Sequence, residues 1–333
     1  MNICVLGAGA WGLAIADLLN SNGCKITVWE FDKKICESVI KDRRIESKLP
    51  GYKIPDKIEF TSDIFQAVKE AGVIINAVPT QFIRSYFSKI RDIDFSEKTV
   101  VNVSKGIELS TGKDIREMFI SEFKTITDHN FVVLAGPSFA IEVALNKTPT
   151  AVVAACKNIE TANYVRDLFS NRYFRVYSTD DVIGVELGGS VKNILAISAG
   201  VIDGLGLGNN TKAALLTRGL SEMTRFGVAM GGKRETFSGL SGIGDLVLTC
   251  NSSLSRNWQV GNRIAKGEKL GDIIKSMNMV AEGVDTCRVV KKIAEEKDIS
   301  MPIVFMVYEL LFSGMDPKAG ITELMTREKK KED

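Results

Sequence analysis

The first thirty residues constrain the fold more than any other part of the chain. Residues 2–6 are a short apolar run of strand length, which meets the turn Gly7-Ala8-Gly9-Ala10-Trp11-Gly12 without a spacer. Helix-forming residues with apolar spacing follow from Trp11 to Leu19, and a second strand, Cys24 to Trp29, leads to Glu30. This order of strand, glycine-rich turn, helix, strand and carboxylate predicts a dinucleotide-binding unit.

Each glycine of the turn has a predicted task. Gly7 allows the tight turn, Gly9 lets backbone amides approach a pyrophosphate, and Gly12 lets the helix pack close to the strand. The unpaired amides and the dipole at the helix N-terminus favour an anion there without any charged side chain. We therefore expect these three glycines to contact the cofactor.

Glu30 predicts which dinucleotide is preferred. It lies eighteen positions after Gly12, a spacing typical of the acidic residue that hydrogen-bonds a ribose 2′-hydroxyl. Because a carboxylate repels a 2′-phosphate, we predict a preference for NAD(H). NADP(H) stays open, since Lys33 or Lys34 can reach a 2′-phosphate.

Length and composition restrict the class of protein. A chain of 333 residues can form two domains, and a net charge of +2 indicates no attraction to nucleic acid. We find no apolar run near the ~18 residues of a membrane span, and no secretion signal at the amino terminus. We therefore expect a cytoplasmic protein without a membrane span. The six cysteines are scattered singly, which predicts neither a disulfide framework nor a metal site.

The alternation of short strands with helices predicts the fold class. As far as about residue 180 this alternation is typical of a mostly parallel sheet covered on both faces. Beyond that point we expect only helices separated by glycine-rich turns. The sequence thus predicts an α/β protein in which a doubly wound Rossmann-type sheet precedes an all-helical carboxyl-terminal domain. We place the dinucleotide-binding domain at 1–183 and the helical substrate domain at 184–333.

Lys192 is a candidate for proton transfer. It lies in the nearly uncharged stretch 182–202, where Glu186, six positions away, does not share its face. Burial would lower the pKa of Lys192 from ~10.4 toward working pH, where general acid–base catalysis is efficient. The single histidine, His129, lies in a polar turn that we expect at the surface. The alternatives are that Lys192 reaches the surface or pairs with Glu186.

Three further segments carry weaker signals. Lys105 follows a predicted strand at the cofactor edge of the sheet, and Asp245 follows a glycine-rich segment suited to close backbone approach. Arg256 stands between two polar donors and can clamp an anionic group. A solvated loop lysine, a loose connector and an exposed surface arginine are the respective alternatives.

Together, these signals resemble the bacterial type of NAD(P)-dependent glycerol-3-phosphate dehydrogenase over nearly the whole chain. Nine ordered motifs carry the resemblance: GAGAWG (7–12), NAVPTQ (76–81), VSKGIE (103–108), LAGPSFAIEV (134–143), ELGGSVKN (186–193), GLGLGNNTKAALLTRG (204–219), SGLSGIGDLVLTC (238–250), SRN (255–257) and AEGV (281–284).

The resemblance implies reversible hydride transfer between a nicotinamide and carbon 2 of dihydroxyacetone phosphate or sn-glycerol 3-phosphate, which supplies the backbone for phospholipid synthesis. Lys192 matches the proton donor and acceptor of the family, which also implies a homodimer and no metal. The matches to substrate contacts are Lys105, Gly136, Ser138, Lys192, Asp245, Ser255, Arg256 and Asn257. The matches to cofactor contacts are Ala10, Trp11, Glu30, Phe31, Lys105, Ala140, Arg256, Val280 and Glu282.

The sequence departs from the family at the ribose position. Many bacterial members carry a basic residue where this chain has Phe31-Asp32, which favours NADH over NADPH. Two rival interpretations remain: a dehydrogenase with the same two-domain plan that acts on a β-hydroxy acid or a ketopantoate-like substrate, and a non-catalytic sensor that binds NADH.

Overall fold

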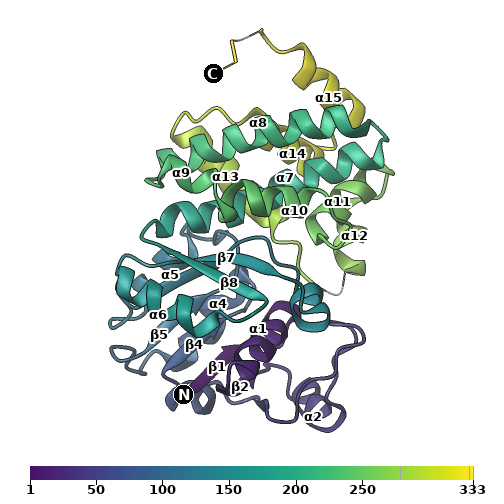
Figure 1. Cartoon of the computed structure of the whole chain (residues 1–333). Helices are drawn as coiled ribbons and strands as arrows, with labels where there is room; N and C mark the ends of the chain where they lie inside the picture. Colours follow the sequence, from purple (N-terminus) through teal and green to yellow (C-terminus); the bar gives the residue numbers. More distant parts are fainter. Residues whose placement is uncertain (278, 330, 333) are drawn as a thin grey trace.

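A computed structural model describes residues 1–277, 279–329 and 331–332. One sheet lies at one end of the molecule and a group of helices lies at the other (Figure 1). The strand order is β3-β2-β1-β4-β5-β6-β7-β8, and every neighbouring pair is parallel except β6 and β7. The predicted doubly wound, mostly parallel sheet is confirmed. Its strands are β1 (Asn2–Leu6), β2 (Lys25–Trp29), β3 (Glu59–Thr61), β4 (Val73–Asn76), β5 (Thr99–Asn102), β6 (Phe131–Ala135), β7 (Thr150–Ala155) and β8 (Phe174–Thr179).

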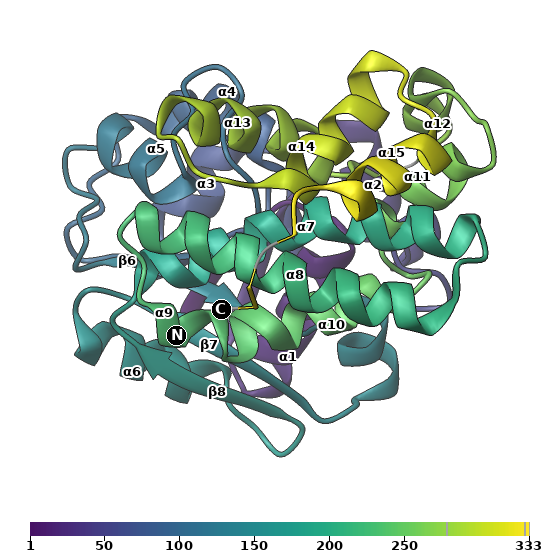
Figure 2. The same cartoon turned by 90° about the horizontal axis from the view of Figure 1, so that it is seen from above.

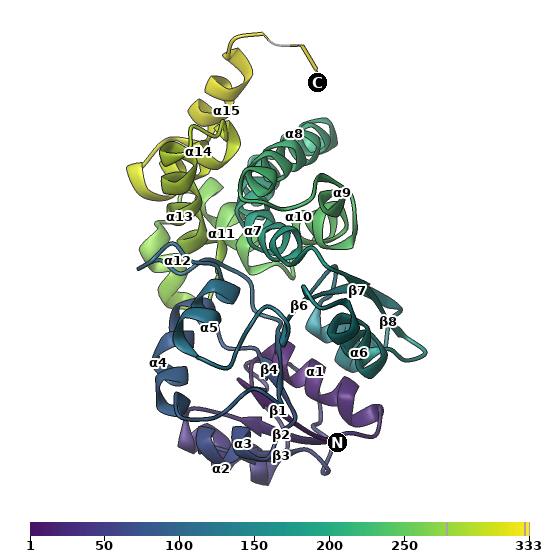
Figure 3. The same ribbon diagram turned by 90° about the vertical axis from the view of Figure 1, so that its left-hand side faces the viewer.

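Helices cover both faces of this sheet, with α1 and α6 on one side and α4 and α5 on the other (Figure 3). Asp63 caps the helix after β3, since its carboxylate accepts from the amides of Phe65 and Gln66. The helical segments of this part are α1 (Ala10–Ser21), α2 (Lys33–Asp42), α3 (Ile64–Lys69), η1 (Thr80–Phe82), α4 (Ile83–Phe87), η2 (Ser88–Ile90), α5 (Ile115–Glu122), η3 (Glu142–Asn146) and α6 (Ile159–Phe169).

Two buried asparagines organise the carboxyl edge of the sheet. Asn76 ends β4 and donates from Nδ2 to Oδ1 of Asn102, which ends β5, at 2.9 Å. The hydroxyl of Ser104 donates to the carbonyl of Val78 at 2.7 Å. These bonds join the two loops that follow β4 and β5, so the position of Lys105 is linked to the neighbouring loop.

The remaining helices form the other part of the molecule, and no strand follows β8 among the residues that the structure describes. Figure 2 shows α8 lying alongside α7. The division at 183/184 stays a prediction; β8 ends at Thr179 and α7 begins at Val182. The segments are α7 (Val182–Gly204), α8 (Gly208–Ala229), α9 (Arg234–Phe237), η4 (Leu240–Gly244), α10 (Asp245–Cys250), α11 (Arg256–Ala265), α12 (Leu270–Ser276), α13 (Gly283–Glu296), α14 (Pro302–Tyr308), η5 (Glu309–Ser313) and α15 (Pro317–Thr326).

Helix α7 is the core of the helical part. Its length and its mean hydropathy of 1.3 meet the criteria for a membrane-spanning helix, so our expectation that no such run occurs is wrong. However, 89% of the apolar window is buried inside the protein. A helix that is apolar on all sides is also what the centre of a helical core requires.

Glycines let α7 and α11 approach until their backbones touch. A Cβ atom added at Gly200 would lie 2.0 Å from the carbonyl oxygen of Trp258, and one at Gly261 would lie 1.9 Å from that of Ile197. These contacts place the N-terminus of α11 against α7.

We predict that Gly261→Ala lowers the free energy of unfolding by about 1–3 kcal/mol, because the added methyl group meets a backbone carbonyl that cannot turn aside. Chemical denaturation measures the change. Gly271→Ala is the matched control, since a Cβ there meets nothing within 4 Å. Equal stability of the two variants would contradict the close contact between α7 and α11.

Candidate active site

The glycine-rich turn after β1 has the geometry of a phosphate cradle. Gly7 has a φ of +106°, and a Cβ at Gly12 would lie 2.0 Å from the carbonyl oxygen of Gly7, so the protein itself requires both glycines. A Cβ at Gly9 would meet nothing within 4 Å. No side chain caps the amides at the start of α1. The open space in front of uncapped amides fits a dinucleotide pyrophosphate.

Glu30 lies at the carboxyl end of β2 and is only 5% exposed. One of its carboxylate oxygens accepts from the amide of Asp32 at 3.0 Å, a contact that the sequence did not predict. Burial raises the pKa of the Glu30 carboxyl group, and the Asp32 amide opposes this rise. The backbone of the turn after β2 therefore holds the Glu30 carboxylate in place at the end of the strand.

Aromatic side chains gather beside Glu30. Phe31 is 60% exposed, and its ring lies 5.7 Å from that of Tyr86 on α4. Both rings line a depression of about 540 Å³, together with Trp29 and Phe65. A recess with aromatic rings in its lining fits the adenine end of a dinucleotide.

Two lysines from separate elements meet at the carboxylate of Asp245. Lys105 follows β5 and lies with its Nζ 2.7 Å from Oδ2 of Asp245, while the Nζ of Lys192 on α7 lies 2.7 Å from Oδ1. Asp245, the first residue of α10, is 1% exposed. Within helix α7, Lys192 is isolated as expected, but both alternatives for it are wrong: it neither reaches the surface nor pairs with Glu186.

The cluster shifts the pKa values of its members. Burial lowers the pKa of Lys192 to about 8; Asp245 opposes the fall and the charge of Lys105 adds to it. Burial acts to raise the pKa of Asp245, but the two ammonium groups hold it below its ordinary value. Near neutral pH Asp245 is thus a carboxylate, and Lys192 is an ammonium group whose proton is easily released.

Thr249 is a site residue that the sequence analysis missed. Its hydroxyl oxygen lies 2.5 Å from Nζ of Lys192 and 3.3 Å from Oδ1 of Asp245. Thr249 follows Asp245 by four positions on the same helix, so the two side chains share a face. That spacing was the signal that could have identified it.

The start of α11 carries the three residues of the SRN motif. Ser255 caps the helix by accepting from the amide of Trp258 at 3.2 Å. Arg256 is exposed and donates to the carbonyl of Val280. The side-chain oxygen of Asn257 accepts from the amide of Gly283 at 3.0 Å, which fixes the side chain and leaves its NH₂ group as a donor for a ligand.

Glu282 joins the helical part to the sheet. Its carboxylate accepts from the amide of Thr80 at 3.2 Å, in the segment after β4. Burial raises the pKa of Glu282 to about 7, and the charge of Arg256 opposes the rise. The structure thus brings Arg256, Val280 and Glu282 together beside the carboxyl edge of the sheet.

The loop after β6 completes this edge. Gly136 has a φ of +151° and lies against Val152, and the hydroxyl of Ser138 donates to the carbonyl of Gly136 at 3.1 Å. A Cβ at Gly244, next to Asp245, would lie 3.7 Å from Pro137. The loop that carries the predicted substrate residues therefore adjoins the Asp245 segment. Ala140, further along this loop, packs with Ala10 and Trp11 against the core of the sheet domain.

Two of our predictions concern His129 and the six cysteines. His129 is exposed, as predicted. Five of the six cysteines are buried and all six thiols are free.

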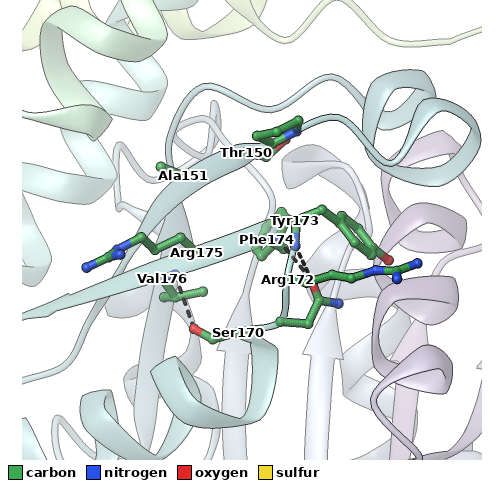
Figure 4. Close-up of a pocket in the computed structure, with 10 residues that line it drawn as sticks. Thr150, Ala151, Ser170, Arg172, Tyr173, Phe174, Arg175 and Val176 are labelled. Atoms are coloured by element: carbon green, nitrogen blue, oxygen red, sulfur yellow. Dashed lines mark hydrogen bonds between the residues drawn. The ribbon is translucent and has the colours of Figure 1, made fainter.

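A separate depression of about 630 Å³ lies at the starts of β7 and β8 and includes Arg172 and Arg175 (Figure 4). None of the predicted site residues lines it.

Comparison with known proteins identifies the family. A family model described as NAD-dependent glycerol-3-phosphate dehydrogenase N-terminus matches residues 2–162, and the corresponding C-terminus model matches residues 181–322. The chain belongs to the NAD-dependent glycerol-3-phosphate dehydrogenase family. As a member of this family it is an oxidoreductase.

Individual relatives agree over their whole length. The glycerol-3-phosphate dehydrogenase [NAD(P)+] of Chlorobium phaeobacteroides (strain BS1) is 46% identical over 100% of this chain and 99% of its own. That of Lysinibacillus sphaericus (strain C3-41) is 45% identical over 99% of this chain and 97% of its own. The crystal structure of glycerol-3-phosphate dehydrogenase (gpsA) from Coxiella burnetii has a TM-score of 0.93 and 34% identity, and covers 98% of this chain and 99% of that one.

We predict that Gly9→Ala weakens NADH binding by about tenfold or more, because a methyl group would occupy the space that a pyrophosphate needs. Its melting temperature should stay close to that of the wild type, since the added Cβ has no neighbour within 4 Å. Fluorescence titration with NADH and a thermal melt measure the two effects. Gly271→Ala is the control variant. Gly23→Ala is unsuitable, because Gly23 has a positive φ. Unchanged NADH affinity would contradict the cradle.

Proposed function

We propose that the protein is an NAD(P)-dependent sn-glycerol-3-phosphate dehydrogenase, which interconverts dihydroxyacetone phosphate and sn-glycerol 3-phosphate. The observation that carries this proposal is the buried Asp245 with Lys105 and Lys192 on its two oxygens, at 2.7 Å each. This cluster lies at the carboxyl edge of a sheet that also carries a pyrophosphate cradle. Open α/β sheets bind their ligands at that edge. We further infer that the product supplies the glycerol phosphate backbone of phospholipids.

Lys192 serves as the proton donor during ketone reduction. The nicotinamide supplies the hydride. As negative charge develops on the substrate oxygen, the ammonium group of Lys192 stabilises it and then donates its proton to that oxygen. In the reverse direction, the neutral amine accepts the proton of the alcohol. Asp245 and Thr249 orient the amine, since both lie within hydrogen-bond distance of its Nζ.

The start of α11 binds the substrate phosphate. The helix has ten residues, so its first amides and dipole favour an anion. The guanidinium of Arg256 supplies a positive charge beside those amides, and Ser255 and the NH₂ group of Asn257 supply further donors. Lys105, Gly136 and Ser138 complete the substrate site. Binding energy from the phosphate then holds the ketone in position for hydride transfer.

The cofactor lies along the carboxyl edge of the sheet, from the cradle to Glu282. Gly7, Gly9, Gly12, Ala10 and Trp11 hold the pyrophosphate, and Glu30 and Phe31 hold the adenosine end. The residues near the nicotinamide are Lys105, Ala140, Arg256, Val280 and Glu282. We also infer that the protein acts in the cytoplasm and that it is a homodimer. Light scattering of the purified protein tests the homodimer.

The rival functions make different demands on the site. A dehydrogenase of β-hydroxy acids or ketopantoate-like acids binds a carboxylate, and turnover of such an acid faster than dihydroxyacetone phosphate would support it. A sensor that binds NADH without turnover has no use for an acid with a pKa of about 8. The family membership supports the phosphate substrate over both.

We predict that ketone reduction slows above about pH 8, because Lys192 loses the proton that it must donate, whereas alcohol oxidation accelerates over the same range. Lys192→Ala should lower kcat by at least about 100-fold and remove this pH dependence. The tests are the rates of NADH oxidation during ketone reduction and of NADH formation during alcohol oxidation, measured for the wild type and the variant from pH 6 to 10 at ~1 unit intervals. Lys233→Ala, an exposed lysine paired with Asp180, is the control. Turnover within a factor of two in Lys192→Ala would refute the role of the lysine.

We predict that kcat/KM is about tenfold or more higher with NADH than with NADPH, because the Glu30 carboxylate repels a 2′-phosphate. Glu30→Gln should reduce the ratio, since glutamine keeps an acceptor for the Asp32 amide but has no charge. Glu37→Gln, on the exposed side of α2, should leave the ratio unchanged. Initial rates with both cofactors measure it, and a clear preference of the wild type for NADPH would overturn the argument from Glu30.

A further inference from the structure

Ser190 lies on α7, two residues before Lys192. Its side chain is fully buried. The hydroxyl donates to the carbonyl of Glu186 at 2.9 Å and accepts from the amide of Gly106 at 3.0 Å. The first bond fixes the hydroxyl on its own helix, so that its lone pair points to the loop after β5.

That loop contains Lys105, and the bond from Gly106 involves the peptide group between Lys105 and Gly106. The carbonyl of this same peptide group accepts from the hydroxyl of Thr80 at 3.1 Å. One end of the peptide is therefore held by the segment after β4 and the other end by α7. Gly106 has a φ of +140°, and a Cβ there would lie 2.7 Å from Oγ1 of Thr80, so little room remains for this backbone to move.

The fixed peptide directs the side chain of Lys105. From this peptide the Lys105 side chain passes Gly189 of α7, whose added Cβ would lie 3.6 Å from Cγ of the lysine, and ends 2.7 Å from Asp245. A shift of the peptide would move the ammonium group away from Asp245 and from the substrate site. Displacements of this kind reduce binding even when every contact residue is present.

We propose that Ser190 is a positioning residue for substrate binding, which acts by holding the Lys105–Gly106 peptide through its hydroxyl oxygen. The inference rests on the proposed function, in which Lys105 contacts the substrate. Ser190 does not touch the substrate itself. Its effect is transmitted by one hydrogen bond from the helical part to the sheet part of the molecule.

The same helix offers a matched control. Ser198 lies two turns further along α7 and is also buried, but its hydroxyl has no hydrogen-bond partner among the described residues. Ser198→Ala removes the same atom from the same helix without affecting the active-site loops. Its kinetic constants should equal those of the wild type.

Ser190→Ala should raise the KM for dihydroxyacetone phosphate by about tenfold and change kcat by less than about threefold, because it weakens a binding contact that ground state and transition state share. A purely structural role predicts a lower melting temperature with unchanged KM. Initial rates with NADH, together with thermal melts of both serine variants, separate these results. A KM within twofold of the wild type would overturn the proposal.

A double-mutant cycle with Lys105→Ala tests the route of the effect. If Ser190 acts through Lys105, Ser190→Ala should change KM by less than about twofold once Lys105 is already alanine. An undiminished tenfold effect in that background would contradict the proposal. Should Lys105→Ala alone leave KM unchanged, the substrate assignment of Lys105 fails, and with it that part of the proposed function. If Ser190→Ala does not fold, Ser190→Cys, whose thiol is a weak acceptor, replaces it in the cycle.

Discussion

A single buried carboxylate holds the two parts of this protein in their working arrangement. Asp245 cannot remain charged in the interior without partners, because an isolated buried charge is costly and a buried ion pair that loses one partner is strongly destabilised. Its partners are Lys105, from the sheet part, and Lys192, from the central helix. The buried charge of Asp245 is therefore stable only when the elements that carry Asp245, Lys105 and Lys192 come together. The point of convergence is also where a proton can be exchanged, since Lys192 has a pKa of about 8 there.

Helix α7 is the common support of this arrangement. Near its start, Glu186 accepts from the amides of Ile115 and Arg116, the first two residues of α5 in the sheet part. Further along, Ser190 holds the Lys105 loop, and then Gly200 admits the backbone of α11. One rigid element thus sets the distances between the proton donor, the second lysine and the anion-binding helix start. Its nearly uniform burial is the physical reason for the apolar composition of residues 182–204.

Particular residues show how far sequence reasoning reached. Two glycines of the first turn could be interpreted from local geometry, because Gly7 has a positive φ and Gly12 lies against the carbonyl of Gly7, five positions away. The burial of Lys192 followed from its apolar neighbours, but its partner did not, since Asp245 is 53 positions away on another helix. The bond from the Asp32 amide to Glu30 was missed because the backbone conformation of the turn after β2 decides it, and no residue pattern shows that conformation. Thr249 was missed although its spacing from Asp245 was visible.

By itself the sequence determined the order of strands and helices, the change to an all-helical carboxyl-terminal part, and the residue types available for chemistry. These properties depend on local periodicity and on motifs of adjacent residues, which a chain carries wherever it folds. Only the tertiary structure decided that Lys105 and Lys192 share one carboxylate, that Asn257 has one side-chain group already occupied, and that Ser190 reaches the loop of Lys105. Those contacts join residues between 26 and 140 positions apart. No local pattern encodes them, because they arise from the packing of elements whose relative positions are set by the whole core.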